Sequence, residues 1–210
     1  MAVRNTTKIT SAIIALEKGN LNDKVAISKY AAETGGTAIW LEAGEQLTLE
    51  QLLYAMLLNS ANDATVAVAE HIGGSETNFV KMMNDFAKSI GAVDTHYVNA
   101  HGLHDDNHYS SAYDLALLGR YAMRNPKFKE IVATKRMTIP WAGHPWNRVL
   151  TNKNKFIENP ELYPGADGVK NGFTTPAGYC LVASATRNGM RLIAVVMNCP
   201  SATEEIKKMF

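Results

Sequence analysis

Three short stretches of the chain combine amine, hydroxyl and amide side chains, which are the groups that acyl transfer requires. They are Asn5-Thr6-Thr7-Lys8, Ser60-Ala61-Asn62 and Lys170-Asn171-Gly172. A lysine three residues after another side chain of one helix lies on the same face, so Lys8 can take a proton from a group at position 5 if its amine is neutral. Burial, a helix N-terminus and the second cation Lys170 all disfavour charge on Lys8. The spacing therefore predicts a site with a lysine as general base.

The second stretch lies between two segments with helical patterns. Apolar residues recur at positions 49, 52, 53, 56 and 57, which predicts an amphipathic helix opened by Thr48 with Gln51 in capping-box position. Residues 61–72 are small or apolar all round, as expected of a helix buried on every side. We therefore expect Ser60 and Asn62 at a helix start inside the protein, and the simplest interpretation of Ser60 alone is an N-cap.

The rest of the pattern predicts an α+β fold in which helices cover an antiparallel sheet. Asn188-Gly189 is the preferred pair of a two-residue hairpin turn, so 179–198 reads as two strands, and 170–173 should pair on them as a further strand. The other expected elements are helices at 6–17, 75–90, from Ser110 or Ser111 to about 125 and from 126 to 133, extended segments at 25–28 and 38–41, and a projecting hairpin at 136–150.

Composition excludes several classes of function. The 210 residues carry a formal net charge of +1 and no basic cluster, which argues against a nucleic-acid partner. No apolar run reaches the roughly 18 residues of a membrane span, and the first residues do not resemble a signal peptide. Four histidines at 96, 101, 104 and 108 invite a metal interpretation, but their spacing fits no closed zinc site, so we expect no metal.

In this order and spacing, the three stretches resemble the Ser-x-x-Lys, Ser-x-Asn and Lys-Thr-Gly motifs of penicillin-binding proteins and serine β-lactamases. One tripeptide match is weak evidence, whereas three in order are strong. The flanking segments GGTAIWLEAGE, SANDATVAVAEHIGGS, HGLHDDNHYSSAYDLALLGR and PGADGVKNGFTTPAGYCLVASATRNGMRLIAVVM are most similar to the low-molecular-mass D-alanyl-D-alanine carboxypeptidases. The resemblance covers nearly the whole chain and implies a β-lactamase/transpeptidase-like fold.

The resemblance also implies a serine-type, cofactor-free cleavage of peptidoglycan stem peptides that end in D-Ala-D-Ala, with β-lactams as inhibitors. Asn5 corresponds to the nucleophile, Lys8 to its base, and Ser60 to a proton relay. Asn62 would hydrogen-bond both Lys8 and the substrate backbone, while Lys170 supplies a second cation. Backbone N–H groups of residues 5 and 173 would form the oxyanion hole. The substrate would pair with the strand at 170–173, and the residues expected to bind it are Lys153, Lys170, Asn171, Gly172 and Phe173.

Two positions depart from the family pattern. Asn5 stands where the family has its nucleophilic serine, and an amide has no hydroxyl proton for Lys8 to remove. Thr6 and Thr7 carry hydroxyls, but neighbouring helix positions point away from residue 5. Asn171 replaces the threonine of Lys-Thr-Gly, and its NH₂ group can still donate to a carboxylate.

Three alternatives follow from these departures. The chain is a serine-type carboxypeptidase by family, or a pseudoenzyme that binds D-Ala-D-Ala ends or β-lactams without acylation, whether Asn5 is natural or introduced. A class A β-lactamase is disfavoured because no Glu-x-x-Leu-Asn stretch lies between Ser60 and Lys170.

Family members carry an export signal and further segments, so we expect residues 1–210 to form one carboxypeptidase-like domain trimmed at both ends. We expect this domain to be extracytoplasmic, with any membrane contact made by segments outside this sequence. His101 resembles the family's His-Gly-Leu loop, with a structural or a catalytic role.

Overall fold

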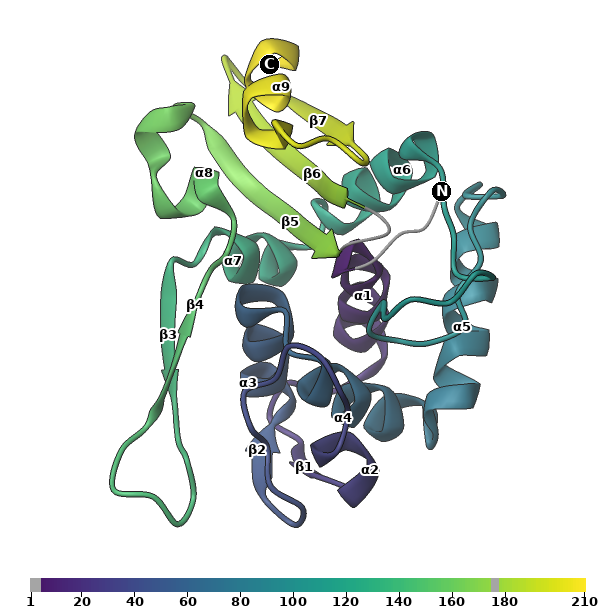
Figure 1. Ribbon diagram of the computed structural model, residues 1–210, viewed down its shortest axis with the longest axis vertical. Helices are drawn as coiled ribbons and strands as arrows, with labels where there is room; N and C mark the ends of the chain where they lie inside the picture. The colour runs from purple at the N-terminus through teal and green to yellow at the C-terminus, as the bar shows by residue number, and fades with distance from the viewer. Residues whose placement is uncertain (1–4, 175–177) are drawn as a thin grey trace.

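The computed structural model describes residues 5–174 and 178–210, and at residues 5, 173 and 174 it describes the backbone alone. A three-stranded antiparallel sheet lies at one end of the molecule and a block of helices at the other, so the expected α+β fold is confirmed (Figure 1). The hairpin of β3 (Arg136–Ile139) and β4 (Arg148–Thr151) projects from the body, as its alternating pattern predicts.

The main sheet has the strand order β5-β6-β7, formed by β5 (Ala166–Thr174), β6 (Gly178–Arg187) and β7 (Met190–Val196). Arg187 faces Met190 across the predicted turn, where Asn188 and Gly189 have φ angles of 50° and 76°. Positive φ at both central residues is what a type I′ turn requires. Lys170 pairs with Val182, so the predicted third strand is confirmed, and β5 forms one edge of the sheet.

The sheet separates two apolar clusters. Helices α1 (Lys8–Lys18) and α6 (Ala112–Ala122) cover one face, where Val182 joins the large core of the helical block. Helix α9 (Ala202–Met209) and the short helix α8 (Lys155–Glu158) cover the other face, over a smaller cluster that includes Phe156, Leu181 and Ile206. Alternation along the strands thus places Lys170 and Asn171 on opposite sides of β5.

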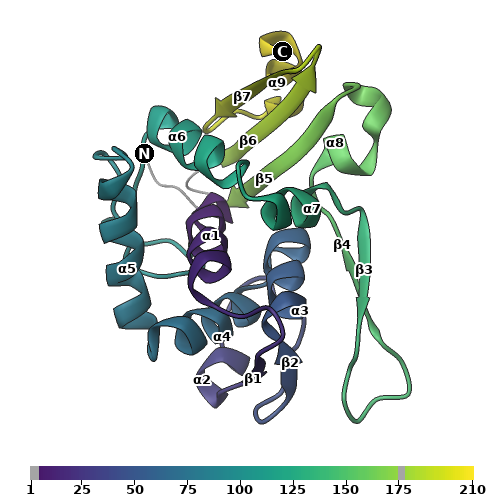
Figure 2. The same cartoon turned by 180° about the vertical axis from the view of Figure 1, so that it is seen from behind.

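Helix α1 is the centre of the helical block. Figure 2 shows it between α5 (Glu76–Ser89) on one side and α3 (Leu49–Tyr54) and α7 (Pro126–Ala133) on the other. It also contacts α4 (Asn62–Gly73). Its residues from Lys8 to Ala15 are all buried, so even the polar side chains of its first two turns lie inside the protein.

The predicted helix starts are largely confirmed. Thr48 and Gln51 form a capping box at α3, Ser75 caps α5, and Ser111, one of the two serines expected there, caps α6. The remaining elements are a 3₁₀ turn η1 (Asn5–Thr7), β1 (Lys24–Ala26), α2 (Lys29–Ala32), β2 (Gln46–Thr48), a π-helical turn η2 (Ala55–Asn59) and a 3₁₀ turn η3 (Pro160–Leu162).

Two local predictions are wrong. Ser60 is not an N-cap: it ends the π-helical turn in a left-handed conformation with a φ of 64°, and Ala61 precedes the first residue of α4. The segment 38–41 joins no strand; β1 pairs with β2 instead. Side-chain acceptors hold this segment, as described below.

Candidate active site

Lys8 is a fully buried lysine at the first position of α1. Its Nζ donates to Asn62 Oδ1 at 2.7 Å and to the main-chain oxygen of His101 at 2.5 Å. Burial, followed by the charge of Lys170, holds the pKa of Lys8 well below its usual value, although Asp63 raises it. A neutral amine can accept a proton, and two donated hydrogen bonds fix its orientation. Lys8 is therefore held in one orientation, and its lowered pKa favours the neutral form of the amine.

Asn62 is oriented by a loop that precedes it by some 25 residues. Its Nδ2 donates to Gly35 O at 2.8 Å, and its backbone N–H donates to Thr37 O at 2.7 Å. Since Nδ2 faces a carbonyl, Oδ1 must face Lys8, so the amide orientation is determined by its partners. Gly36 lies between the two carbonyls with a φ of 87°, and a Cβ there would meet Asn62 Nδ2 at 2.6 Å. A side chain at position 36 would displace the amide.

Ser60 carries a buried hydroxyl two residues before Asn62 in the chain. Only 5% of the residue is exposed, and its Oγ has no hydrogen-bond partner within the described residues. A buried hydroxyl is normally satisfied, and a non-glycine residue with a φ of 64° carries backbone strain. Both features are typical of a side chain whose partner is a ligand.

Lys170 approaches from the sheet. It is 1% exposed, and burial lowers its pKa to about 7. Its Nζ donates to the main-chain oxygen of Asn171 at 3.0 Å and lies 3.3 Å from Asn171 Oδ1. Its charge contributes to the lowered pKa of Lys8, and both residues are buried. Of the motif side chains, the structure thus links Lys8 to Asn62 by a hydrogen bond and to Lys170 through charge.

The backbone of Asn5 belongs to the 3₁₀ turn η1, which contacts β5, so residue 5 and the strand of Phe173 are neighbours. Thr6 and Thr7 are both buried. Thr7 Oγ1 is bonded to His108 Nε2 at 2.8 Å, and Thr6 Oγ1 has no hydrogen-bond partner in the described part of the chain.

The predicted substrate-binding residues lie along the edge strand β5. Asn171 Nδ2 donates to the main-chain oxygen of Lys153 at 3.0 Å, which joins the two positions expected to recognise a carboxylate. The Lys153 backbone N–H in turn donates a hydrogen bond to Leu58 O at 3.2 Å, although Lys153 as a whole is exposed to solvent. Gly172 is buried and pairs with Cys180, and the Phe173 backbone pairs with Tyr179.

The histidine loop supports α1 from its other side. Burial lowers the pKa of His101 to about 4, with Lys8 contributing, and His101 Nδ1 accepts from the Leu103 N–H at 3.1 Å. Burial likewise lowers the pKa of His108 to about 4. His101 thus contacts Lys8 through its main-chain carbonyl, whereas its ring forms a hydrogen bond within its own loop. Within the described residues, no three His, Cys, Asp or Glu side chains gather where a metal ion could bind.

Sequence reasoning missed the groups that hold segment 38–41. Asp63 Oδ2 accepts from the backbone N–H groups of Ile39 and Leu41, each at 3.1 Å. Arg148, from the projecting hairpin, donates to Ile39 O and Trp40 O, each at 2.8 Å, and forms a buried ion pair with Glu45. The carboxylate of Asp63, among the small and apolar residues that begin the helix at 61–72, was the available signal, because a buried charge needs partners.

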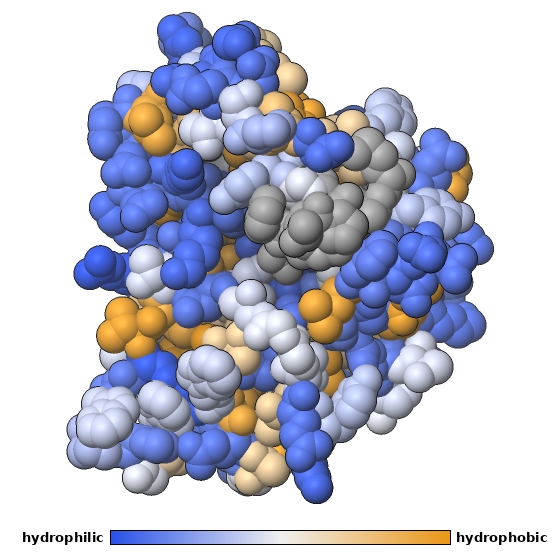
Figure 3. All heavy atoms as spheres, in the orientation of Figure 1, coloured by the Kyte–Doolittle hydropathy of each residue, from blue (hydrophilic) through white to orange (hydrophobic). Residues whose placement is uncertain are grey.

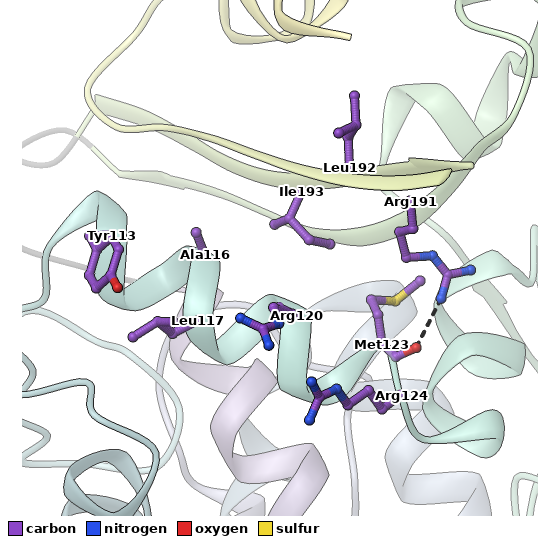
Figure 4. A pocket seen from close by; sticks show the side chains of 9 residues that line it. All are labelled: Tyr113, Ala116, Leu117, Arg120, Met123, Arg124, Arg191, Leu192 and Ile193. Atoms are coloured by element: carbon purple, nitrogen blue, oxygen red, sulfur yellow. Dashed lines mark hydrogen bonds between the residues drawn. The ribbon is translucent and has the colours of Figure 1, made fainter. Parts of the chain in front are cut away.

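A hollow of about 460 Å³ lies away from these residues, between α6 and β7 (Figure 4). Arg120, Arg124 and Arg191 line it together with apolar side chains. Arg191 is engaged, since it donates to Met123 O at 3.0 Å and to Asp167 at 2.7 Å. No residue of the three motifs lines this hollow, so we do not include it in the candidate site.

The chain is similar in sequence to known D-alanyl-D-alanine carboxypeptidases. It is 40% identical to the D-alanyl-D-alanine carboxypeptidase DacF of Bacillus subtilis over 97% of this chain and 53% of that protein. It is 34% identical to the D-alanyl-D-alanine carboxypeptidase DacC of Escherichia coli over 91% of this chain and 48% of that protein. The chain thus spans about half the length of these relatives.

Solved structures give the same result. A D-alanyl-D-alanine carboxypeptidase of Mycobacterium tuberculosis superposes with a TM-score of 0.89 at 29% identity, over 99% of this chain and 81% of that one. A variant of a Streptomyces DD-transpeptidase superposes with a TM-score of 0.88 at 31% identity, over 99% and 85%. The family model described as D-alanyl-D-alanine carboxypeptidase matches residues 4–201. The chain therefore belongs to the D-alanyl-D-alanine carboxypeptidase family of low-molecular-mass penicillin-binding proteins.

Proposed function

We propose that the chain carries the catalytic cleft of a serine-type carboxypeptidase that removes the terminal D-alanine from peptidoglycan stem peptides. The observation that supports this best is the buried Lys8, whose amine is bonded to Asn62 at 2.7 Å and whose pKa is lowered by burial and by Lys170. Burying the amines of two lysines is energetically unfavourable, and residues with perturbed pKa values are common at functional sites.

Each motif residue then has a chemical role. Lys8 takes the proton from a hydroxyl at position 5 as that oxygen attacks the peptide carbonyl. Ser60, whose Oγ lacks a partner among the described residues, relays the proton to the leaving amine. Lys170 keeps Lys8 neutral, and Asn62 orients it. The backbone N–H groups of residues 5 and 173 stabilise the oxyanion, which fits the contact between η1 and β5.

The substrate binds as an added strand along β5, the edge strand that carries Lys170 to Phe173. Gly172 gives the peptide backbone close access to the strand. Lys153 and Asn171 lie at the end where the terminal carboxylate is expected, and their mutual hydrogen bond of 3.0 Å holds the pair together. β-Lactams occupy the same strand and the same oxyanion position.

Asn5 limits what this chain does as written. An amide cannot attack the carbonyl, and removal of a nucleophilic serine costs on the order of 10⁶ in turnover in a well-studied serine protease. We therefore propose that this chain binds D-Ala-D-Ala ends and β-lactams reversibly and does not form an acyl-enzyme. The proposal holds whether the asparagine is natural or introduced.

Peptidoglycan as substrate implies a place of action outside the cytoplasm, and we propose that setting for residues 1–210 as one carboxypeptidase-like domain. Along 5–174 and 178–210, no helix combines the length and apolar character of a membrane span.

Intact-mass spectrometry after exposure to penicillin tests the proposal, with calorimetry on the same sample. The expected result is an unchanged protein mass together with saturable binding heat, and binding should be lost in Lys153→Glu, which reverses the charge near the carboxylate. A covalent adduct on the chain as written, or binding that Lys153→Glu leaves intact, contradicts it.

A further inference from the structure

The chain has three tryptophans, and all of them lie where the loop after Gly36 meets the tip of the β3–β4 hairpin. Trp40 is 71% exposed and Trp146 is 61% exposed. Large aromatic side chains are usually buried, and a group of exposed ones marks a surface that binds something. Figure 3 shows pale, near-neutral side chains gathered over this lower-left corner of the molecule.

Polar groups separate the rings and fix them. Glu42 Oε1 accepts from Trp141 Nε1 at 3.2 Å and is 2.8 Å from His144 Nε2. The His144 ring lies between two indoles, with its centroid 4.1 Å from that of Trp141 and 6.0 Å from that of Trp146. We call Trp40, Trp141, His144 and Trp146, with Glu42, the tryptophan platform.

Arg148 supports the platform from below. Its guanidinium carbon lies 4.4 Å from the centroid of the Trp141 ring, and its Nη2 donates to Trp40 O at 2.8 Å. Glu45 pairs with the same guanidinium, so Arg148 has no charge left for a ligand. Trp40 keeps a φ of 61°, a strained conformation for a bulky residue, which this network holds in place.

We propose that the tryptophan platform binds a chain of pyranose sugars. A pyranose ring has an apolar C–H face, which stacks on an indole, and a rim of hydroxyl groups, which bond to carboxylate and imidazole groups. The platform offers both kinds of group: the tryptophans provide aromatic faces, and Glu42 and His144 provide polar groups. An anionic membrane would need unpaired cations, whereas the charges here are Glu42 and a neutralised Arg148.

The platform is connected to the candidate active site through one short segment. Gly35 O and Thr37 O hold Asn62, and Trp40 follows three residues after Thr37. If the proposed function is correct, the peptide substrate is attached to an amino-sugar chain, and a sugar held here raises the local concentration of peptide at β5. This step of the argument rests on the proposed function; the sugar site itself does not.

Tryptophan fluorescence tests the inference directly, because every tryptophan of the chain lies in the platform. We expect a saturable change in emission during titration with the β-1,4-linked tetramer of N-acetylglucosamine. Trp146→Ala, and Trp40→Asn, which suits a positive φ, should each weaken binding about tenfold or more, the loss expected for one stacked ring. The matched control is Tyr113→Ala on α6, which removes an aromatic side chain that is 72% exposed and should leave the affinity unchanged.

No saturable change at millimolar tetramer overturns the inference, and so does an affinity that Trp146→Ala leaves intact. An emission shift with vesicles of anionic phospholipid but not with the tetramer overturns it in favour of a membrane surface. Neither titration uses Lys8, Ser60 or Lys170, so failure of the proposed peptidase function would appear separately, as loss of β-lactam binding with the tetramer titration intact.

Discussion

The Nζ of Lys8 and the Oδ1 of Asn62 are 2.7 Å apart, although the two residues are 54 positions apart in the chain. The hydrogen bond joins the first residue of α1 to the first residue of α4, and both residues are buried. Since a loop carbonyl fixes the other end of the Asn62 amide, the position of Lys8 depends on three separate segments. The chemistry proposed for this site requires that such a base be neutral, which leads to predictions about pH.

Lys170 should make stability increase with pH. Its pKa is about 7 in the folded protein against 10.5 for an ordinary lysine, so between these values the unfolded chain binds the extra proton. Raising the pH through this window therefore favours the folded state, by up to about 1.4 kcal/mol per pH unit. Urea unfolding from pH 7 to 10 should show this slope in the wild type and a flatter one in Lys170→Met. Equal pH slopes in the wild type and in Lys170→Met would mean that burial does not lower the pKa of Lys170.

His108 should have its effect at acid pH. Burial lowers its pKa from 6.5 to about 4, so the unfolded state takes up a proton first as the pH falls. The free energy of unfolding should decrease by about 1.4 kcal/mol per pH unit on its account between pH 6.5 and 4. His108→Gln should show a smaller decrease over that range in urea titrations, although it starts from lower stability because the bond to Thr7 is weakened. An equal decrease in both proteins argues against a buried neutral ring.

Arg148 and Glu45 should behave as a buried pair. Removing one partner leaves a buried charge unpaired, so Arg148→Met should cost about 3–5 kcal/mol of unfolding free energy. The double variant Glu45→Leu/Arg148→Met should recover a large part of that loss, as measured by urea unfolding. The exposed pair Lys29–Glu33, at 3.7 Å, provides the control: Lys29→Met should change stability by less than about 1 kcal/mol. Additive losses in the double variant would contradict the pairing.

Local patterns predicted the elements that depend on local chemistry. The capping box at Thr48, the turn at Asn188-Gly189 and the pairing of 170–173 were all readable, because caps, turns and alternation act within a few residues. The order of the three motifs indicated which residues to examine for chemistry. Nothing local, however, specifies that a lysine of α1 meets an amide of α4.

What the sequence could not give depends on contacts between distant segments. The conformation of Ser60 follows from the π-helical turn before it, which no propensity scale anticipates. Segment 38–41 has the composition of a strand, yet its N–H groups are satisfied by Asp63 instead of by a neighbouring strand. The pair Arg148–Glu45 spans 103 positions, and a charge pair at such a separation leaves no periodic signal.

Asn171 should limit the rate of acylation once a nucleophile is present. It lacks the threonine hydroxyl, and one hydrogen bond to a charged carboxylate is worth roughly 1.5–3 kcal/mol, or about 10- to 150-fold in affinity. In an Asn5→Ser background, adding Asn171→Thr should speed adduct formation with penicillin by about that factor, measured as the rate of mass increase at subsaturating drug. Gly36→Ala in the same background should slow it, because a Cβ would lie 2.6 Å from Asn62 Nδ2. If Asn171→Thr leaves the rate unchanged, position 171 does not contact the carboxylate.

The most direct measurement is the intact mass of the Asn5→Ser variant after incubation with penicillin. If Lys8, Ser60, Asn62 and Lys170 have the proposed roles, a serine hydroxyl at position 5 should be acylated and the mass should increase by one penicillin, while the chain as written stays unmodified. Lys8→Met in the Asn5→Ser background should abolish the adduct. A folded Asn5→Ser protein that remains unlabelled after prolonged exposure would contradict the assignment of these four residues to catalysis.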